Sequence, residues 1–131
     1  MLNFRQFEAG PDPFGRAWQV CFKWLQTAIA LRHSDTVDAR FVLQRDGERL
    51  EKTIALPHPV LRELARARGR ELTDPWCSRL AALHLRHIVA TGEDWENEPA
   101  TPSAVQLGGY AAAIETAEQE EIRRRAGVVR A

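Results

Sequence analysis

Apolar and polar residues alternate most regularly between Thr36 and Leu56, on either side of the dipeptide Asp46-Gly47. Asp-Gly is a preferred pair for a tight type I′ turn, and a two-residue loop here would fix the register of two antiparallel strands. The pairs predicted on the apolar face are Leu43 with Leu50, Phe41 with Lys52, Ala39 with Ile54, and Val37 with Leu56. The other face is largely polar. The pattern therefore predicts a hairpin with one solvent-facing side and one side that other elements must cover.

Two further strands are predicted before this hairpin. Residues 2–7 alternate over a short stretch and stop at a Gly-Pro-Asp-Pro turn sequence, which is typical of an edge strand. In residues 17–31 the apolar positions alternate from Trp18 to Trp24 and resume in the opposite phase at Leu25, a shift that a β-bulge produces. A helix over these residues would be apolar on every side. The aromatic and β-branched residues favour a bulged strand, with a helix as the alternative.

Two helices are predicted after the hairpin. Pro59 suits the first position of a helix that ends near Gly69. Asp74 is expected to cap a second helix, with Pro75 at its first position, and this helix extends to about Ala90. Both helices can cover the apolar side of the sheet.

Residues 101–131 form a predicted C-terminal helical segment. Ser103 and Gln106 have the spacing of a capping box, in which two side chains bond reciprocally to backbone N–H groups. Gly108-Gly109 is expected to interrupt the helix. The part that follows is rich in Ala and Glu and ends in arginines, which is the charge order that the helix dipole favours. Its apolar stripe is thin, so this segment is expected either to dock loosely or to bind a partner.

Composition indicates an ordinary folded domain. The chain has 131 residues, 44% of them hydrophobic, and its eighteen basic residues balance eighteen acidic ones. No overall charge would therefore draw it to nucleic acid, an anionic membrane or an acidic substrate. Strands come first and helices afterwards. This order predicts a single α+β domain over residues 1–131, with an antiparallel sheet of three to four N-terminal strands, including the Asp46-Gly47 hairpin, covered by two to three C-terminal helices.

The chain shows no sign of export or membrane insertion. Its first residues lack a charged-then-apolar leader, and no apolar run approaches the roughly 18 residues that a membrane-spanning helix needs. The only cysteines are Cys21 and Cys77, too few for a disulfide framework. We expect a cytoplasmic protein without membrane contact.

The strongest candidates for chemistry are Cys77, His84 and His87 on the second predicted helix. N–H groups at a helix start can lower a thiol pKa, and two histidines at i and i+3 can share a metal, so a thiol- or metal-dependent enzyme is one alternative. However, Cys77 and His84 are seven residues apart, about 10 Å of helical rise, too far for a hydrogen bond between them. Helical angles place both on the buried stripe and His87 at its rim. We interpret this segment as a core helix and expect no catalytic residue, metal or cofactor.

A second alternative is nucleic-acid binding through the basic helix Arg62–Arg70. Arg62, Arg66, Arg68 and Arg70 concentrate positive charge there, and the turn into the next helix resembles a helix-turn-helix in outline. That next helix lacks the outward Asn, Gln, Ser or Thr residues that read bases, and nearby acids dilute the charge.

The remaining candidates indicate protein contacts. Trp95 lies in an acidic loop, where it either stays exposed for a partner or folds back as a lid on the sheet. Tyr110 and Ile114 lie on the thin stripe of the last helix. The sequence therefore predicts a non-enzymatic binding or regulatory module that acts through a protein partner or self-association, with Trp95, Tyr110, Ile114, Arg62 and Arg66 as its candidate binding residues.

Overall fold

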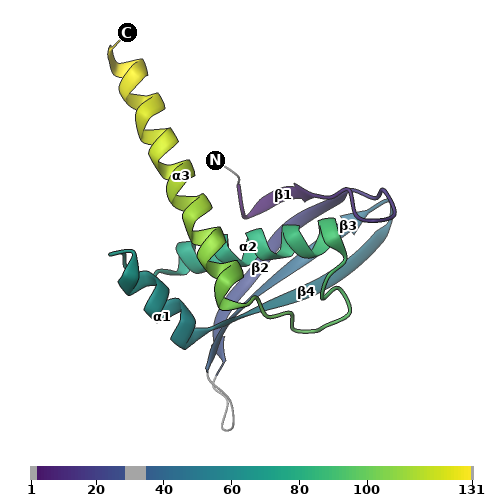
Figure 1. Ribbon diagram of the computed structural model, residues 1–131. Coiled ribbons are helices and arrows are strands. Elements are labelled where there is room, and N and C mark those ends of the chain that lie inside the picture. The colour runs from purple at the N-terminus through teal and green to yellow at the C-terminus, as the bar shows by residue number, and fades with distance from the viewer. Residues whose placement is uncertain (1–2, 29–34, 131) are drawn as a thin grey trace.

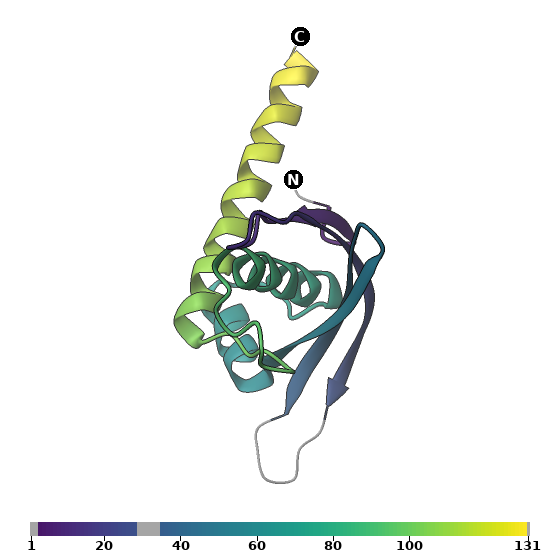
Figure 2. The same cartoon turned by 90° about the vertical axis from the view of Figure 1, so that its right-hand side faces the viewer.

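The computed structural model describes residues 3–28 and 35–130, and it confirms the predicted α+β architecture (Figure 1). In chain order the elements are β1 (Gln6–Ala9), β2 (Trp18–Ala28), β3 (Thr36–Arg45), β4 (Glu48–Pro57), α1 (His58–Ala67), α2 (Asp74–Thr91) and α3 (Ala104–Arg130). The strands form one antiparallel sheet in the order β1-β2-β3-β4. The helices follow the sheet in sequence, and α2 lies in the hollow of its curved face (Figure 2).

The β3–β4 hairpin has the predicted register. Its Cα partners include Leu43 with Leu50, Phe41 with Lys52, Ala39 with Ile54, and Val37 with Leu56. Asp46 and Gly47 have φ angles of 40° and 84°, the positive values that a type I′ turn requires at both central positions. Burial alternates along β3, so one face of the hairpin contributes to the core.

Strand β2 carries the bulge that the sequence indicates, but earlier than the change of phase suggests. Phe22 pairs with Phe41 and Trp24 with Arg40, so the extra residue is Lys23. The apolar pattern changes phase only at Leu25, because Trp24 directly after the bulge is also apolar and hides the extra residue at Lys23. Leu25 then lies opposite Ala39, on the core side. The predicted strand residues 29–31 lie outside the described residues.

Strand β1 begins later than predicted, at Gln6 instead of residue 2. Asn3 forms a turn, because its Oδ1 accepts a hydrogen bond from the Arg5 N–H at 3.1 Å and its carbonyl accepts one from the Gln6 N–H at 3.2 Å. This Asx-type turn uses backbone groups that a strand would need for pairing. Of residues 3–5, only Arg5 still bonds to β2, through its carbonyl and the Phe22 N–H.

The cap of α2 is Thr73, so the prediction of Asp74 as the cap was wrong. The Thr73 hydroxyl accepts a hydrogen bond from the Trp76 N–H at 3.3 Å, and Asp74 is the first helical residue. Cys77 is consequently the fourth helical residue and not the third. The helix ends at Gly92, which adopts a left-handed conformation with φ of 78°, as a helix C-cap glycine commonly does.

Helix α3 is continuous through Gly108-Gly109, and the predicted interruption was wrong. Leu107 and Ala111, on either side of the glycines, are fully buried, so packing outweighs the low helix propensity of glycine. The capping box is confirmed by reciprocal hydrogen bonds between Ser103 and Gln106, at 2.9 and 3.1 Å. The second half of α3 projects away from the other elements (Figures 1 and 2). No helix in the described ranges combines the length and apolarity needed to cross a membrane.

Helix α2 is the centre of the core. It contacts β1, β3 and β4 on the sheet side and α3 on the other side, which explains why its buried residues occupy most of its circumference. Its fully buried large side chains are Trp76, Leu80, His84, Leu85 and Ile88. Because each apolar side chain of this size is worth about 1.5–3 kcal/mol when buried, α2 supplies a large part of the hydrophobic stabilisation.

One buried cation ties the loop after α2 to the sheet. Lys52 is 7% exposed on the core side of β4. Its ammonium donates hydrogen bonds to the carbonyl oxygens of Trp95 and Asn97, the latter at 3.0 Å. Burial lowers the pKa of Lys52, partly offset by Glu98. The ammonium replaces the water that these two carbonyls would otherwise bind.

The same loop also pairs with the edge of β4. The Ala55 N–H donates to the Ala100 carbonyl at 2.9 Å, and the Ala100 N–H donates to the Thr53 carbonyl at 3.0 Å. The Thr53 N–H donates to the Glu98 carboxylate at 2.9 Å. Backbone and side-chain bonds therefore fix the position of residues 95–100.

We predict that Lys52→Met lowers the free energy of unfolding by about 2 kcal/mol, because the carbonyls of Trp95 and Asn97 lose their donor. Urea unfolding followed by tryptophan fluorescence measures the change. The matched control is Lys23→Met, which removes an exposed ammonium paired with Glu51 at 2.8 Å and is expected to cost less than about 1 kcal/mol. Equal losses in the two variants would contradict the role of Lys52.

Candidate functional site

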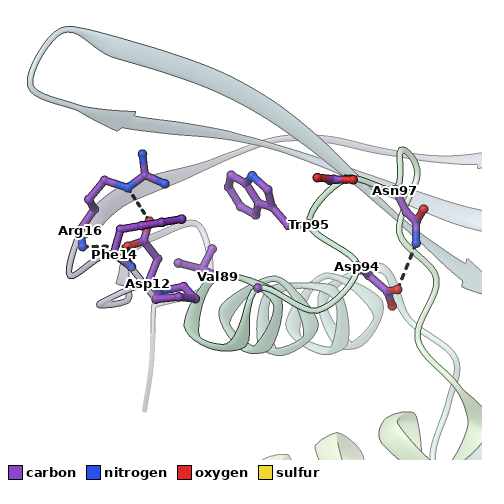
Figure 3. Close-up of a pocket in the computed structure, with 10 residues that line it drawn as sticks. Asp12, Phe14, Arg16, Val89, Asp94, Trp95 and Asn97 are labelled. Atoms are coloured by element: carbon purple, nitrogen blue, oxygen red, sulfur yellow. Dashed lines mark hydrogen bonds and ion pairs between the residues drawn. The ribbon is translucent and has the colours of Figure 1, made fainter.

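A cavity of about 420 Å³ lies between the β1–β2 loop and the loop that follows α2 (Figure 3). The first loop contributes Asp12, Phe14 and Arg16, and the second contributes Asp94, Trp95 and Asn97. Val89, near the C-terminal end of α2, also lines it. The cavity brings together residues that are more than 70 positions apart in the chain.

Asp12 organises the first loop. Its Oδ1 accepts hydrogen bonds from the N–H groups of Phe14 and Arg16, at 2.9 and 2.8 Å, and its Oδ2 accepts from Arg16 Nε at 2.7 Å and from Trp18 Nε1 at 3.3 Å. Burial acts to raise the pKa of Asp12, but the bonds from Arg16, Trp18 and Phe14 outweigh it and hold the pKa at about 2. The carboxylate stays ionised at neutral pH and fixes the loop conformation.

The fixed loop presents an aromatic ring to solvent. Phe14 is 81% exposed, whereas most large apolar side chains of this protein are buried. The Arg16 guanidinium lies over the Phe14 ring at 5.1 Å and over the Trp18 ring at 5.5 Å, both within the range of cation–π attraction. Phe14 is therefore held at the surface by its neighbours.

Trp95 forms the facing wall and folds back against the sheet, as a lid does. Its ring centroid lies 6.3 Å from that of Trp18, and the Lys52 ammonium lies 5.2 Å from the ring. Asp94, next to it, has a φ of 58° and accepts a hydrogen bond from Asn97 Nδ2 at 3.0 Å. The wall is thus a half-buried aromatic ring beside a structured acidic turn.

The charges of the cavity are unequal. Its lining contains the carboxylates of Asp12, Asp94 and Glu96 and one guanidinium, that of Arg16. Asp12 and Arg16 pair with each other, which leaves the two carboxylates of the second loop as the uncompensated charge. Aromatic faces beside carboxylates are a general environment for a cationic group.

The binding residues predicted from the sequence lie at separate places. Trp95 lines the cavity, whereas Tyr110 and Ile114 pack α3 against the body. Ile114 is only 5% exposed. On α1, Arg66 forms an ion pair with Glu63, and Arg62 lies with Nη2 3.4 Å from a ring nitrogen of His58.

The other arginines of the basic segment hold the helices together. Arg68 pairs with Glu115 of α3 at 2.7 Å, and Arg70 pairs with Glu118 at 3.1 Å. In each pair the glutamate neutralises an arginine that could otherwise bind a phosphate of nucleic acid. The positive field around α1 is accordingly smaller than the sequence suggests.

Cys77 and His84 are core residues of α2. Cys77 is 2% exposed, and burial, with a further contribution from Asp74, raises the pKa of its thiol to about 11. His84 is fully buried, and its Nδ1 lies 2.8 Å from the Tyr110 hydroxyl. Burial, reinforced by His87, lowers the pKa of His84 to about 4. A neutral imidazole therefore joins α2 to α3.

His87 lies at the rim of the helix, as the helical angles predict. Its ring stacks on that of His84 with centroids 6.1 Å apart, and its Nε2 lies 2.9 Å from the Glu93 carboxylate. In residues 3–28 and 35–130 no three side chains of His, Cys, Asp or Glu lie together as a metal site. His84 and His87 are thus neighbours without a third ligand among the described residues.

Sequence analysis missed Asp12, Phe14 and Arg16 as parts of a site. The Gly-Pro-Asp-Pro sequence was recognised only as a turn. An available signal was the large apolar Phe14 next to Gly15, directly after an aspartate that can form an Asx turn. The facing loop could not be paired with it from the sequence, because only the fold brings the two loops together.

Comparisons with protein-family models, curated proteins and solved structures find no match for this chain.

We predict that Cys77 in a Cys21→Ser background reacts slowly with iodoacetamide, because the thiol is buried and its pKa is about 11. Mass spectrometry of samples labelled between pH 7 and pH 10 gives the rate with and without denaturant. Full reaction is expected only in denaturant. Rapid labelling of the folded protein at pH 7 would contradict the assignment of Cys77 to the core.

We predict that acid destabilises the protein through His84. The unfolded imidazole, with a pKa near 6.5, takes up a proton that the folded one, with a pKa of about 4, does not. Stability is therefore present above pH 6.5 and declines as the pH falls toward 4, by about 2 kcal/mol between pH 7 and pH 5. Urea unfolding at both pH values should show this loss in the wild type and in the control His87→Gln, but not in His84→Gln. An unchanged pH dependence in His84→Gln would contradict it.

Proposed function

We propose that this protein is a non-enzymatic binding module that acts through protein contacts, and that its contact patch is the rim of the cavity between the two loops. The patch consists of Phe14, Trp95, Asp94 and Glu96. Cys77 and His84, the residues with the most obvious chemistry, do not line this cavity. This supports binding over catalysis there.

The observation that carries the proposal is the exposure of Phe14 on a loop fixed by Asp12. Exposing a phenyl ring forgoes roughly 1.5–3 kcal/mol of burial. Here the exposed ring is also held in place, by the Asp12 hydrogen bonds to the loop and by the guanidinium of Arg16. A partner that covers Phe14 would not have to order this loop, because the loop is already fixed. Most of the free energy gained by burying the ring would therefore contribute to affinity.

The chemistry of the rim favours a partner segment with an apolar side chain next to a positive charge. Phe14 and Trp95 offer aromatic surface, and Asp94 and Glu96 offer uncompensated carboxylates. A cavity of about 420 Å³ holds one or two side chains. A lysine or arginine beside a leucine or an aromatic residue would complement both features.

The second half of α3 is a further exposed surface for contact. Tyr110 and Ile114 are already engaged with the body, so the available part of the helix lies beyond Glu118. Ile122 is 66% exposed there and is followed by three arginines. This part of α3 can add contacts to a partner held at the cavity, or support self-association.

We predict that the protein selects peptides with a basic residue next to an apolar one from a displayed random peptide library. Affinity of a selected peptide, measured by fluorescence polarisation, should fall at least about tenfold in Phe14→Ala, because a buried aromatic anchor is worth more than about 1.4 kcal/mol. Asp94→Asn with Glu96→Gln should weaken binding of the basic residue and reduce its salt dependence.

The matched control is Val105→Ala, which trims another highly exposed apolar side chain, 86% exposed at the start of α3. It is expected to leave peptide affinity unchanged. Selected peptides that bind Phe14→Ala as tightly as the wild type would place the contact patch elsewhere and refute the proposal.

A further inference from the structure

The outer edge of β2 is open over part of its length. Strand β1 pairs with Trp18–Cys21, and one more bond joins the Phe22 N–H to the Arg5 carbonyl at 2.8 Å. Beyond the bulge at Lys23, residues 24–27 pair with β3 on one side only, and no described residue pairs with their other side. Figure 2 shows β2 continuing well past β1.

The end of β1 is defined by local hydrogen bonds. The N–H groups of Arg5 and Gln6 bond to Asn3, and neither Asn3 nor Phe4 pairs with β2. A strand added beside residues 24–27 of β2 would lie in line with β1. One of its ends would be next to the turn at residues 3–6, and its other end would be next to Thr27. Because alternate residues of a strand bond to opposite sides, about half of the backbone groups of residues 24–27 face the open side, where an added strand could pair them.

This edge also lacks the features that protect the other edge of the sheet. On β4, Ala100 bridges to residues 53–55, and the remaining part carries the charges of Arg49 and Glu51. The bulge at Lys23, an exposed charge, protects only the start of this stretch, and residues 24–27 beyond it are Trp-Leu-Gln-Thr, with neither a charge nor a proline. Natural edge strands commonly use such charges, prolines or coverings to prevent the addition of a strand.

Two hollows accompany the open edge on the side that faces α2. One, of about 380 Å³, is bordered mainly by Phe4, Phe22 and Pro75. The other, of about 360 Å³, is bordered by Val37 and Leu72 and also by the polar side chains of Thr27 and His58. Leu25 and Asp74 border both. Since alternate residues of an added strand would point toward α2, successive inward side chains would enter the two hollows.

We propose that an extended segment of a partner protein adds to β2 at Trp24–Thr27, antiparallel to β2 and in line with β1, with small apolar side chains in the two hollows. Main-chain bonds would supply affinity and the hollows would supply specificity, as in other cases of strand addition. A second copy of this chain fits less well, because its own β1 occupies the same edge and would lie across the approach. The proposal does not depend on the patch around Phe14.

The test is an NMR titration of ¹⁵N-labelled protein with a capped hexapeptide of alternating valine and glutamate, whose acidic side chains are repelled by the Asp94 and Glu96 carboxylates of the cavity rim. We expect saturable shifts confined to residues around Trp24–Thr27 and slower hydrogen exchange of their outward amides. The same peptide with alternate amides N-methylated cannot form the bonds and is expected to cause no such shifts. Equal shifts with both peptides would refute strand addition.

A matched pair of variants locates the site. Gln26 and Gln19 are both exposed on β2, but Gln26 lies on the open part and Gln19 on the part paired with β1. Gln26→Glu should weaken binding of the glutamate-containing peptide about two- to fivefold through like-charge repulsion, and Gln19→Glu should leave it unchanged. Equal effects of the two substitutions would refute the location.

Two further measurements separate the alternatives. Binding of the hexapeptide to Phe14→Ala should equal that to the wild type, so failure of the cavity proposal and failure of this one are distinguishable. Hydrogen exchange of the free protein should show that the amides of residues 24–27 exchange rapidly, and analytical ultracentrifugation gives its oligomeric state. A dimer in which the amides of residues 24–27 are already protected would assign this edge to a second copy and overturn the partner assignment.

Discussion

The fold depends on covering the one apolar face of its antiparallel sheet. The alternation in β3 and β4 places one set of side chains on a single side, and that side excludes water only when α2 lies against it. Because α3 then covers the back of α2, the helix between them must be apolar around most of its circumference. Cys77 and His84 are polar residues within this central helix. The thiol stays protonated and the imidazole neutral because ionising either group there would cost too much.

Two charged side chains fix the two loops that border the cavity. Asp12 fixes the loop that carries Phe14, and Lys52 holds the loop that carries Trp95. Each satisfies backbone groups of an irregular segment that would otherwise need water. The cavity between them results from two local hydrogen-bond networks and from the sheet that brings them together.

The sequence predicted what depends on neighbouring residues and missed what depends on distant ones. The β3–β4 register followed from alternation and one Asp-Gly turn, and the Ser103–Gln106 cap followed from spacing alone. Gly108-Gly109 was expected to break α3, but burial of Leu107 and Ala111 against the body outweighed propensity. Lys52 had a correct strand position but no foreseeable partner, because the carbonyl it binds at Trp95 is 43 residues away. For the same reason the cavity could not be assembled from the sequence.

The projecting part of α3 also has a mechanical consequence. The last of its residues bound by ion pairs to the body is Glu118, and the helix continues to Arg130. At 1.5 Å per residue, these last turns form a rod about 18 Å long. Because a helix is stiff over this length, the projecting part acts as a spacer, and it places Arg130 about that far from the last ion pair with the body.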